Sequence, residues 1–159
     1  MTALVPQRVC LDESGFTLIE LMIAVVVVAI LSSIAIPNYT AYVTRGNITD
    51  ATSGLSTRQV QMEQFYQDNR TYAPVAPVTN ACTADTKAKY FDFSCTGAGA
   101  PTATTFIISA VGKNSMAGFK FTIDQNGVRT TLIDGAVAPS GWTNPNPNTC
   151  WVTKKGGVC

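Results

Sequence analysis

The chain has 159 residues, enough for one folded domain with a short appendage and too few for two independent cores. It is 46% hydrophobic and only 13% charged with a net charge of +1, a composition that excludes a disordered charged tail and gives no bulk attraction to nucleic acid. It contains no histidine, which removes every histidine-dependent triad and zinc site, so we expect a protein that is not an enzyme and has no cofactor or metal.

The first strong pattern is an apolar stretch over 16–36, FTLIELMIAVVVVAILSSIAI. A helix of this length is about 31 Å long and matches the roughly 30 Å hydrocarbon core of a bilayer. The carboxylate of Glu20 costs roughly 3 kcal/mol on insertion scales, which is small beside roughly 20 kcal/mol from the apolar side chains. We therefore predict a membrane-spanning helix at 16–36.

Two other interpretations of this stretch are a cleaved secretory signal and an ordinary single-span anchor. A secretory signal has a shorter apolar run followed by a small-x-small cleavage site, which Ile36-Pro37-Asn38 does not provide. A plain anchor remains open, but it does not explain a glutamate at the edge of the span.

The residues Gly15, Phe16 and Glu20 closely resemble the processing site of type IV prepilins and related pseudopilins, in which glutamate is the fifth residue of the mature chain. The resemblance implies that residues 1–15 are a leader peptide. It also implies that a prepilin peptidase and methyltransferase cuts between Gly15 and Phe16 and then methylates the amine of Phe16. Pro37 continues the resemblance, because family members commonly carry a proline at this position.

The leader departs from the family pattern in its charge. Arg8 is its only basic side chain, and Asp12 and Glu13 lie close to the predicted cut. The leader therefore offers few of the basic residues that set the orientation of a membrane helix. Cys10 would be removed with the leader and needs no disulfide partner.

Glu20 is the predicted assembly residue. In the resembled family this glutamate pairs with the positive N-terminal amine of a neighbouring subunit, which here is the amine of Phe16. Such an attraction is strongest where the dielectric constant is lowest. The alternative is a carboxylate that reaches the membrane surface from the first turn of the helix.

A second helical pattern covers 37–68. Its apolar residues fall on one stripe of a helix: Ala41, Ile48, Ala51, Leu55, Met62 and Phe65. The two segments together predict one helix from Phe16 to about Tyr66. We expect a kink at Pro37, because proline has no backbone N–H group and removes one hydrogen bond of the helix.

The remaining segment, 69–159, is predicted to be a β-domain. Short runs rich in aromatic and β-branched residues predict strands at 90–95, 105–111, 118–124 and 127–133. Asp124-Gln125-Asn126-Gly127 predicts a hairpin between the last two. One long helix followed by strands favours an α+β fold with a small antiparallel sheet laid on the amphipathic half, in agreement with the type IV pilin fold and its disulfide-closed C-terminal region.

Four cysteines lie beyond the leader: Cys82, Cys95, Cys150 and Cys159. An even number beyond a membrane segment indicates two disulfide bonds, for which three pairings exist. We choose nearest neighbours, Cys82 with Cys95 and Cys150 with Cys159, because each pair closes a short loop rich in turn residues. The alternative of a four-cysteine zinc site lacks the usual C-x-x-C spacing.

Two tryptophans and four lysines form a candidate nucleic-acid interface, with the rings stacking on bases and the amines contacting phosphate: Trp142, Trp151, Lys113, Lys120, Lys154 and Lys155. The alternative is a pair of packed tryptophans and a solvated basic face. The layout also resembles minor pilins with a two-disulfide C-terminal half, some of which are DNA-uptake receptors.

We therefore expect a structural subunit of a type IV pilus, major or minor, that serves pilus assembly, adhesion or twitching motility. Its partners would be other pilin subunits and the prepilin peptidase. It would reside in the inner membrane of a Gram-negative-type bacterium as a precursor and then in an extracellular filament. The alternative is a minor pilin that binds DNA during natural transformation, and a type II secretion pseudopilin is a third candidate.

Overall fold

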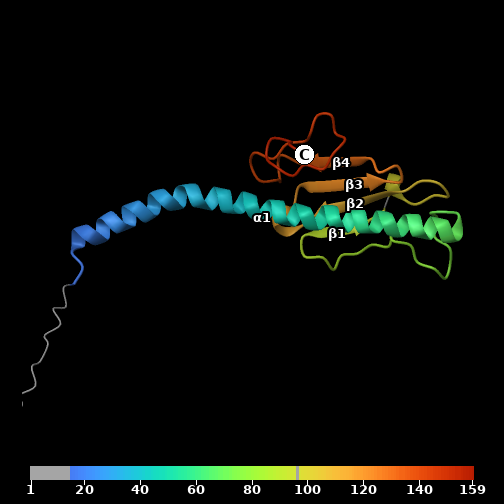
Figure 1. Cartoon of the computed structure of the whole chain (residues 1–159), viewed down its shortest axis with the longest axis horizontal. Coiled ribbons are helices and arrows are strands. Elements are labelled where there is room, and N and C mark those ends of the chain that lie inside the picture. The colour runs from blue at the N-terminus through green and yellow to red at the C-terminus, as the bar shows by residue number, and fades with distance from the viewer. Residues whose placement is uncertain (1–14, 96) are drawn as a thin grey trace, which may run out of the picture. The chain divides into compact units, whose positions relative to one another are not determined.

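The computed structural model describes residues 15–95 and 97–159. They belong to two compact units, one ending at Thr40 and the other covering Ala41–Cys159. The predicted leader with Arg8 and Cys10 lies, apart from Gly15, outside the described residues. The elements follow in the order α1 (Leu18–Asn69), β1 (Phe91–Ser94), η1 (Gly97–Gly99), β2 (Ile107–Gly112), η2 (Asn114–Met116), β3 (Phe119–Asp124) and β4 (Arg129–Ile133) (Figure 1).

Helix α1 begins with a side-chain cap. Thr17 precedes the first helical residue, and its Oγ1 accepts a hydrogen bond from the backbone N–H of Glu20 at 3.3 Å. A threonine at this position satisfies one of the N–H groups that have no partner in the first turn of a helix. The helix then continues through Pro37, which lies inside it and does not end it. The kink expected at Pro37 stays a prediction.

The part of α1 in the second unit packs through one stripe. Its buried residues are Asn47, Ile48, Ala51, Leu55, Met62 and Phe65. The predicted stripe is therefore confirmed except at Ala41, which is only half-buried, and Asn47 is a buried residue that the apolar pattern could not include. The helix ends at Asn69, where Arg70 takes a left-handed conformation (φ 58°) and donates its N–H to the carbonyl of Tyr66 at 2.7 Å.

The four strands form one antiparallel sheet in the order β1-β2-β3-β4. The predicted strands are confirmed, with ends that agree within two residues. Alternate residues of β3 are buried, among them Phe119, Phe121 and Ile123, because successive side chains point to opposite faces of a sheet. This inner face and the stripe of α1 share one hydrophobic core, and the part of the helix that belongs to the second unit runs along the sheet in Figure 1.

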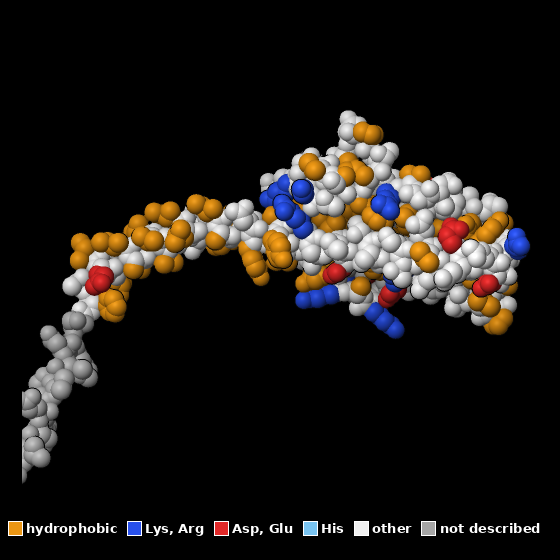
Figure 2. Space-filling view, viewed as in Figure 1, with side chains coloured by type: hydrophobic (Ala, Val, Ile, Leu, Met, Phe, Trp, Pro, Cys, Tyr) orange, Lys and Arg blue, Asp and Glu red, His pale blue; other side chains and the backbone are white. Residues whose placement is uncertain are grey.

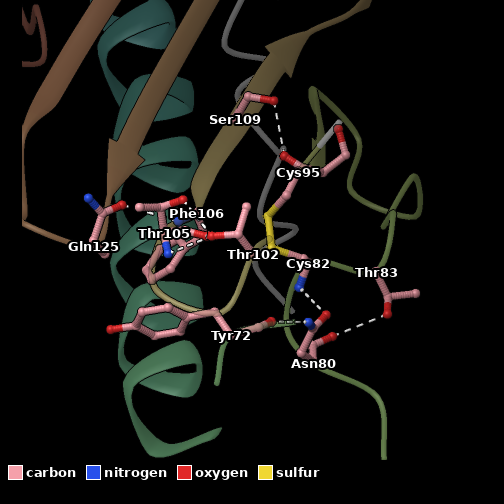
Figure 3. The surroundings of a disulfide bond; sticks show 11 residues. Tyr72, Asn80, Cys82, Thr83, Cys95, Thr102, Thr105, Phe106, Ser109 and Gln125 are labelled. Atoms are coloured by element: carbon pink, nitrogen blue, oxygen red, sulfur yellow. Dashed lines mark hydrogen bonds between the residues drawn. A yellow bond between two sulfur atoms is a disulfide. The ribbon is translucent and has the colours of Figure 1, made fainter. Parts of the chain in front are cut away.

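The loop between α1 and β1 is attached to the sheet by the bond between Cys82 and Cys95. Figure 3 shows how its surroundings are ordered by Asn80, which donates to the carbonyl of Tyr72 at 2.9 Å and accepts from the N–H of Cys82 at 3.2 Å. Both cysteines are buried, as is Asn80. The disulfide and the buried carboxamide therefore fix a loop that has little regular structure.

The C-terminal segment runs beside β4 and is closed by the bond between Cys150 and Cys159. The side chain of Asn148 bonds both backbone groups of Thr131, and that of Asn144 bonds both backbone groups of Ile133. The hydroxyl of Thr131 also donates to the carbonyl of Cys150 at 2.8 Å. Both disulfides thus join the pairs of cysteines that are nearest in the sequence.

Candidate functional site

The N-terminal part of α1 exposes nearly all of its apolar side chains. Leu18, its first residue, is 77% exposed, as is 85% of Phe16 just before the helix, and the most apolar window of the helix is not buried anywhere within the structure. By length and composition this helix can cross a membrane. Figure 2 shows hydrophobic side chains along this segment, a surface suited to lipid or to other apolar helices.

Several polar side chains of this segment donate hydrogen bonds to backbone carbonyls of the same helix. Ser33 donates its hydroxyl to the carbonyl of Ile30 at 2.7 Å, and Asn38 donates its carboxamide to the carbonyl of Ile34 at 2.9 Å. Bonds of this kind let polar residues remain in an apolar environment. They leave few polar groups on the segment that require a partner molecule.

Glu20 differs from these residues. Its carboxylate is exposed, and the ion pairs of the described residues, Arg58 with Asp85 and Lys113 with Asp92, do not include it. Glu20 occupies the third position of α1, where the partial positive charge of the helix N-terminus favours an anion. The sequence contained a further signal here, because Thr17-Leu18-Ile19-Glu20 has the spacing of a capping box.

The candidate DNA-contact residues do not come together in one place. Lys113 follows β2, and its Nζ binds the carboxylate of Asp92 at 2.6 Å and the carbonyl of Thr86 at 2.8 Å. Lys120 lies within β3 on the outer face of the sheet and is exposed. Lys154 and Lys155 are exposed in the loop closed by Cys150 and Cys159. On the face in Figure 2 the basic side chains are scattered.

Both tryptophans are packed, which corrects the expectation that they are stacking platforms. Trp142 is 4% exposed and contacts Phe119 edge to face, with 5.3 Å between the ring centroids. Trp151 is 8% exposed, donates its Nε1–H to the carbonyl of Thr122 at 2.9 Å and lies under the guanidinium of Arg129. Neither ring is open to a nucleobase, because each fills part of the core beside the sheet.

Within residues 15–95 and 97–159, the pKa values of Tyr72 and Asp85 are shifted, and each of these groups takes part in a structural contact. Burial, together with the hydrogen bond to Glu63, raises the pKa of Tyr72 to about 12. The backbone N–H of Lys87 lowers the pKa of the Asp85 carboxyl, with a further contribution from the charge of Arg58. Both shifts therefore arise from contacts within the fold, with Glu63 for Tyr72 and with Lys87 and Arg58 for Asp85.

The described part of the chain holds no cluster of three or more histidine, cysteine or acidic residues that could bind a metal ion. A groove of about 490 Å³ lies beside the Cys82–Cys95 bond and is lined by prolines, small apolar residues, Thr79, Thr83 and Asn80. No titratable side chain lines this groove. Its walls therefore offer apolar packing and hydrogen-bonding groups.

Comparison with known proteins gives two family matches. Residues 11–36 match a model described as the prokaryotic N-terminal methylation motif. Residues 37–120, just over half of the chain, match a model described as the type IV minor pilin ComP, DNA uptake sequence receptor.

Similar curated proteins are bacterial fimbrial subunits. The type IV major fimbrial protein FimA of Dichelobacter nodosus is 33% identical over 129 residues, which is 71% of this chain and 81% of the relative. Fimbrial protein EcpC of Eikenella corrodens is 26% identical over 132 residues, 83% of this chain and 76% of the relative. A fimbrial protein of Pseudomonas aeruginosa is 47% identical over 51 residues, 32% of this chain and 33% of the relative.

Proposed function

This chain belongs to the type IV pilin family, and on that premise we propose that it is cut between Gly15 and Phe16, methylated at Phe16 and polymerised through residues 16–36. Family membership implies a membrane precursor and an extracellular pilus built with other pilin subunits. The observation that supports polymerisation through this segment is its exposed apolar surface, which has no internal partner. Inner-membrane residence, adhesion and twitching motility are the roles we propose for it in a Gram-negative-type bacterium.

Processing is tested with the precursor. Gly15→Leu should accumulate at full length in the membrane, because the resembled processing site has glycine before the cut and a bulky side chain there would obstruct the peptidase. Within the described residues, an added Cβ at Gly15 meets nothing within 4 Å beyond its chain neighbours, so the fold itself tolerates the change. Gly135→Leu is the control, since this glycine of the globular unit also has open space around it. Intact mass measures both the new N-terminus and the methyl group. Normal cleavage of Gly15→Leu would overturn the assignment.

Assembly is tested at Glu20. We propose that its carboxylate pairs with the Phe16 amine of a neighbouring subunit, supported by its exposure and its lack of an ion pair in the described residues. Glu20→Gln preserves size and removes the charge, so the variant should be cleaved and membrane-held yet enter filaments poorly. Asp50→Asn, which removes an exposed carboxylate from the second unit, should assemble normally. Undiminished incorporation of Glu20→Gln would remove the ion-pair proposal.

DNA uptake is the second candidate function. It is favoured by the match of residues 37–120 to the ComP receptor family. The exposed amines of Lys120, Lys154 and Lys155 are the groups we propose for phosphate contact. The tryptophans are omitted because they are buried.

The DNA proposal is tested by the salt dependence of binding. The mature full chain in detergent is titrated with a DNA duplex at several salt concentrations, because each phosphate contact adds about 0.9 to the slope of log affinity against log salt. Lys154→Ala with Lys155→Ala should weaken binding and reduce that slope by about 2. Lys87→Ala with Lys89→Ala, also exposed, is the matched control. Equal losses in both variants would indicate nonspecific charge attraction.

A further inference from the structure

The turn between β3 and β4 carries the only asparagine of the sequence that is followed by glycine, Asn126-Gly127. Asn126 is exposed, and none of the hydrogen bonds in the described part of the chain involves its carboxamide. The carboxamides of Asn80, Asn144 and Asn148, by contrast, are bonded to backbone carbonyls. The side chain of Asn126 is therefore free to meet the backbone that follows it.

An asparagine before a glycine can react with its own chain, because glycine has no side chain to shield its nitrogen. The backbone nitrogen of Gly127 gives its proton to hydroxide and attacks Cγ of Asn126. The N–Cγ bond forms, the bond between Cγ and Nδ2 breaks, and the amide nitrogen takes a proton from water and leaves as ammonia. Water then opens the five-membered imide at either carbonyl and gives aspartate or isoaspartate. Nothing is oxidised or reduced.

The attacking nitrogen is open to its surroundings. Gly127 has a φ of 75°, a left-handed conformation that suits glycine. A Cβ added to Gly127 would have one neighbour within 4 Å in the described part of the chain, the Nε2 of Gln59 at 3.6 Å. Sterically, therefore, little separates this nitrogen from the carboxamide of Asn126.

Hydrogen bonds to Asp124 restrain the same nitrogen. The N–H of Gly127 donates to the carbonyl of Asp124 at 3.1 Å, a bond that it must leave before it can attack. On either side, the N–H groups of Asn126 and Val128 donate to Oδ1 of Asp124 at 2.9 and 2.8 Å. An aspartate that bonds the backbone two residues later is typical of tight turns. Its negative charge also opposes the loss of a proton from the nitrogen nearby.

We propose that Asn126 is a self-modification site, which converts to aspartate and isoaspartate, and that the carboxylate of Asp124 sets the rate of this conversion. The reaction proceeds in molecules whose turn has opened, since the nitrogen of Gly127 is released only there. Isoaspartate lengthens the backbone by one atom, so the bonds from Gly127 and Val128 to Asp124 lose their register. The conversion adds a negative charge and loosens the turn, and it accumulates with the age of the protein.

Peptide mass spectrometry measures the conversion. The full chain in detergent is incubated at mildly alkaline pH, and the peptide that contains Asn126 should gain the mass difference between an amide and an acid. Asp124→Ala should convert about fivefold faster or more, because the turn loses two hydrogen bonds and a charge. Asp124→Ser should lie between the two, because a hydroxyl oxygen keeps a weaker acceptor for the same N–H groups.

Matched variants assign the signal. Asp134→Ala removes another exposed turn carboxylate, which accepts from the N–H of Ala136 at 3.0 Å, and should leave the rate at Asn126 unchanged. Asn126→Gln should abolish the mass gain in this peptide. A parent chain that stays unconverted at Asn126, while the same chain unfolded in urea converts, would overturn the site. Equal rates in the parent and Asp124→Ala would overturn the role of Asp124.

Hydrogen exchange of the parent covers the case in which Asp124→Ala fails to fold. Low concentrations of urea, at which the amides of β2 keep their protection, should open the turn first. Exchange of the Gly127 amide and conversion of Asn126 should then rise by the same factor, because both require this nitrogen to leave Asp124. Conversion that stays constant while the exchange rate rises contradicts control by the turn.

Discussion

The guanidinium carbon of Arg58 lies 4.0 Å from the ring centroid of Phe93. The same guanidinium binds the carboxylate of Asp85, whose backbone exchanges two hydrogen bonds with Phe93, at 2.8 and 2.9 Å. One side chain of α1 therefore contacts both β1 and the loop that precedes it. Arg58 is only 17% exposed at its side chain, so this contact is more sheltered than an ordinary surface ion pair.

Replacing Arg58 by alanine should lower the free energy of unfolding by about 1–2 kcal/mol, because both the contact with the ring and the ion pair are lost. Arg58→Lys should recover only part of this, since an ammonium lacks the planar fork of a guanidinium. Denaturant titration of the mature chain in detergent measures the effect. The exposed Arg45→Ala is the control, and an equal change there would contradict the prediction.

Acid should weaken the fold through Asp85. Its pKa is lowered in the folded protein by the N–H of Lys87 and the charge of Arg58, so its contribution to stability is present above the unfolded pKa and is lost as pH falls through the folded one. We expect Asp85→Asn to be less stable than the parent at pH 7 and to lose less stability below about pH 4. Melting temperatures across this range, with Asp50→Asn as control, check the difference in slope.

Gly54→Ala should destabilise the protein although alanine is the better helix former. A Cβ at this position would lie 2.6 Å from Cζ of Phe93, a buried ring that Arg58 holds in place. Overpacking of this kind costs about 1–3 kcal/mol, more than the roughly 1 kcal/mol gained in helix propensity.

Gly46→Ala is the matched control for Gly54, because it lies in the same helix and nothing is within 4 Å of its added Cβ. It should be neutral or stabilising by up to about 1 kcal/mol. Adding Phe93→Leu to Gly54→Ala should restore part of the lost stability. Equal thermal stability of the two glycine variants would contradict the close approach of helix and strand.

Trp151→Phe tests whether the ring of Trp151 serves only the packing of the core or also contacts DNA. The variant loses the hydrogen bond to the carbonyl of Thr122, so unfolding should become easier by about 1 kcal/mol. Because the ring is buried, the affinity for duplex DNA should not change. A loss of affinity as large as that of the Lys154 and Lys155 variant would show that the ring reaches the ligand after all.

Local patterns predicted much of this fold. The apolar stripe identified Ile48 and Leu55 as core, and the alternation around Phe119 and Phe121 identified a strand, because each pattern repeats with the period of its own element. The short, turn-rich segments between neighbouring cysteines also predicted the correct partners of Cys82 and Cys150. The position of Asn47 inside the stripe was missed because burial of a polar residue leaves no apolar signal.

The sequence by itself predicted the apolar helix, the proposed cut between Gly15 and Phe16 and the proposed assembly role of Glu20, since these depend on the order of residues along one segment. Only the tertiary structure decided that Trp142 and Trp151 are core residues and that Lys113 is bound to Asp92. It also decided that Asn144 and Asn148 cover the edge of β4. The physical reason is that a tryptophan, a lysine or an asparagine suits several environments equally well, and its role depends on which distant backbone or side chain the fold brings within reach.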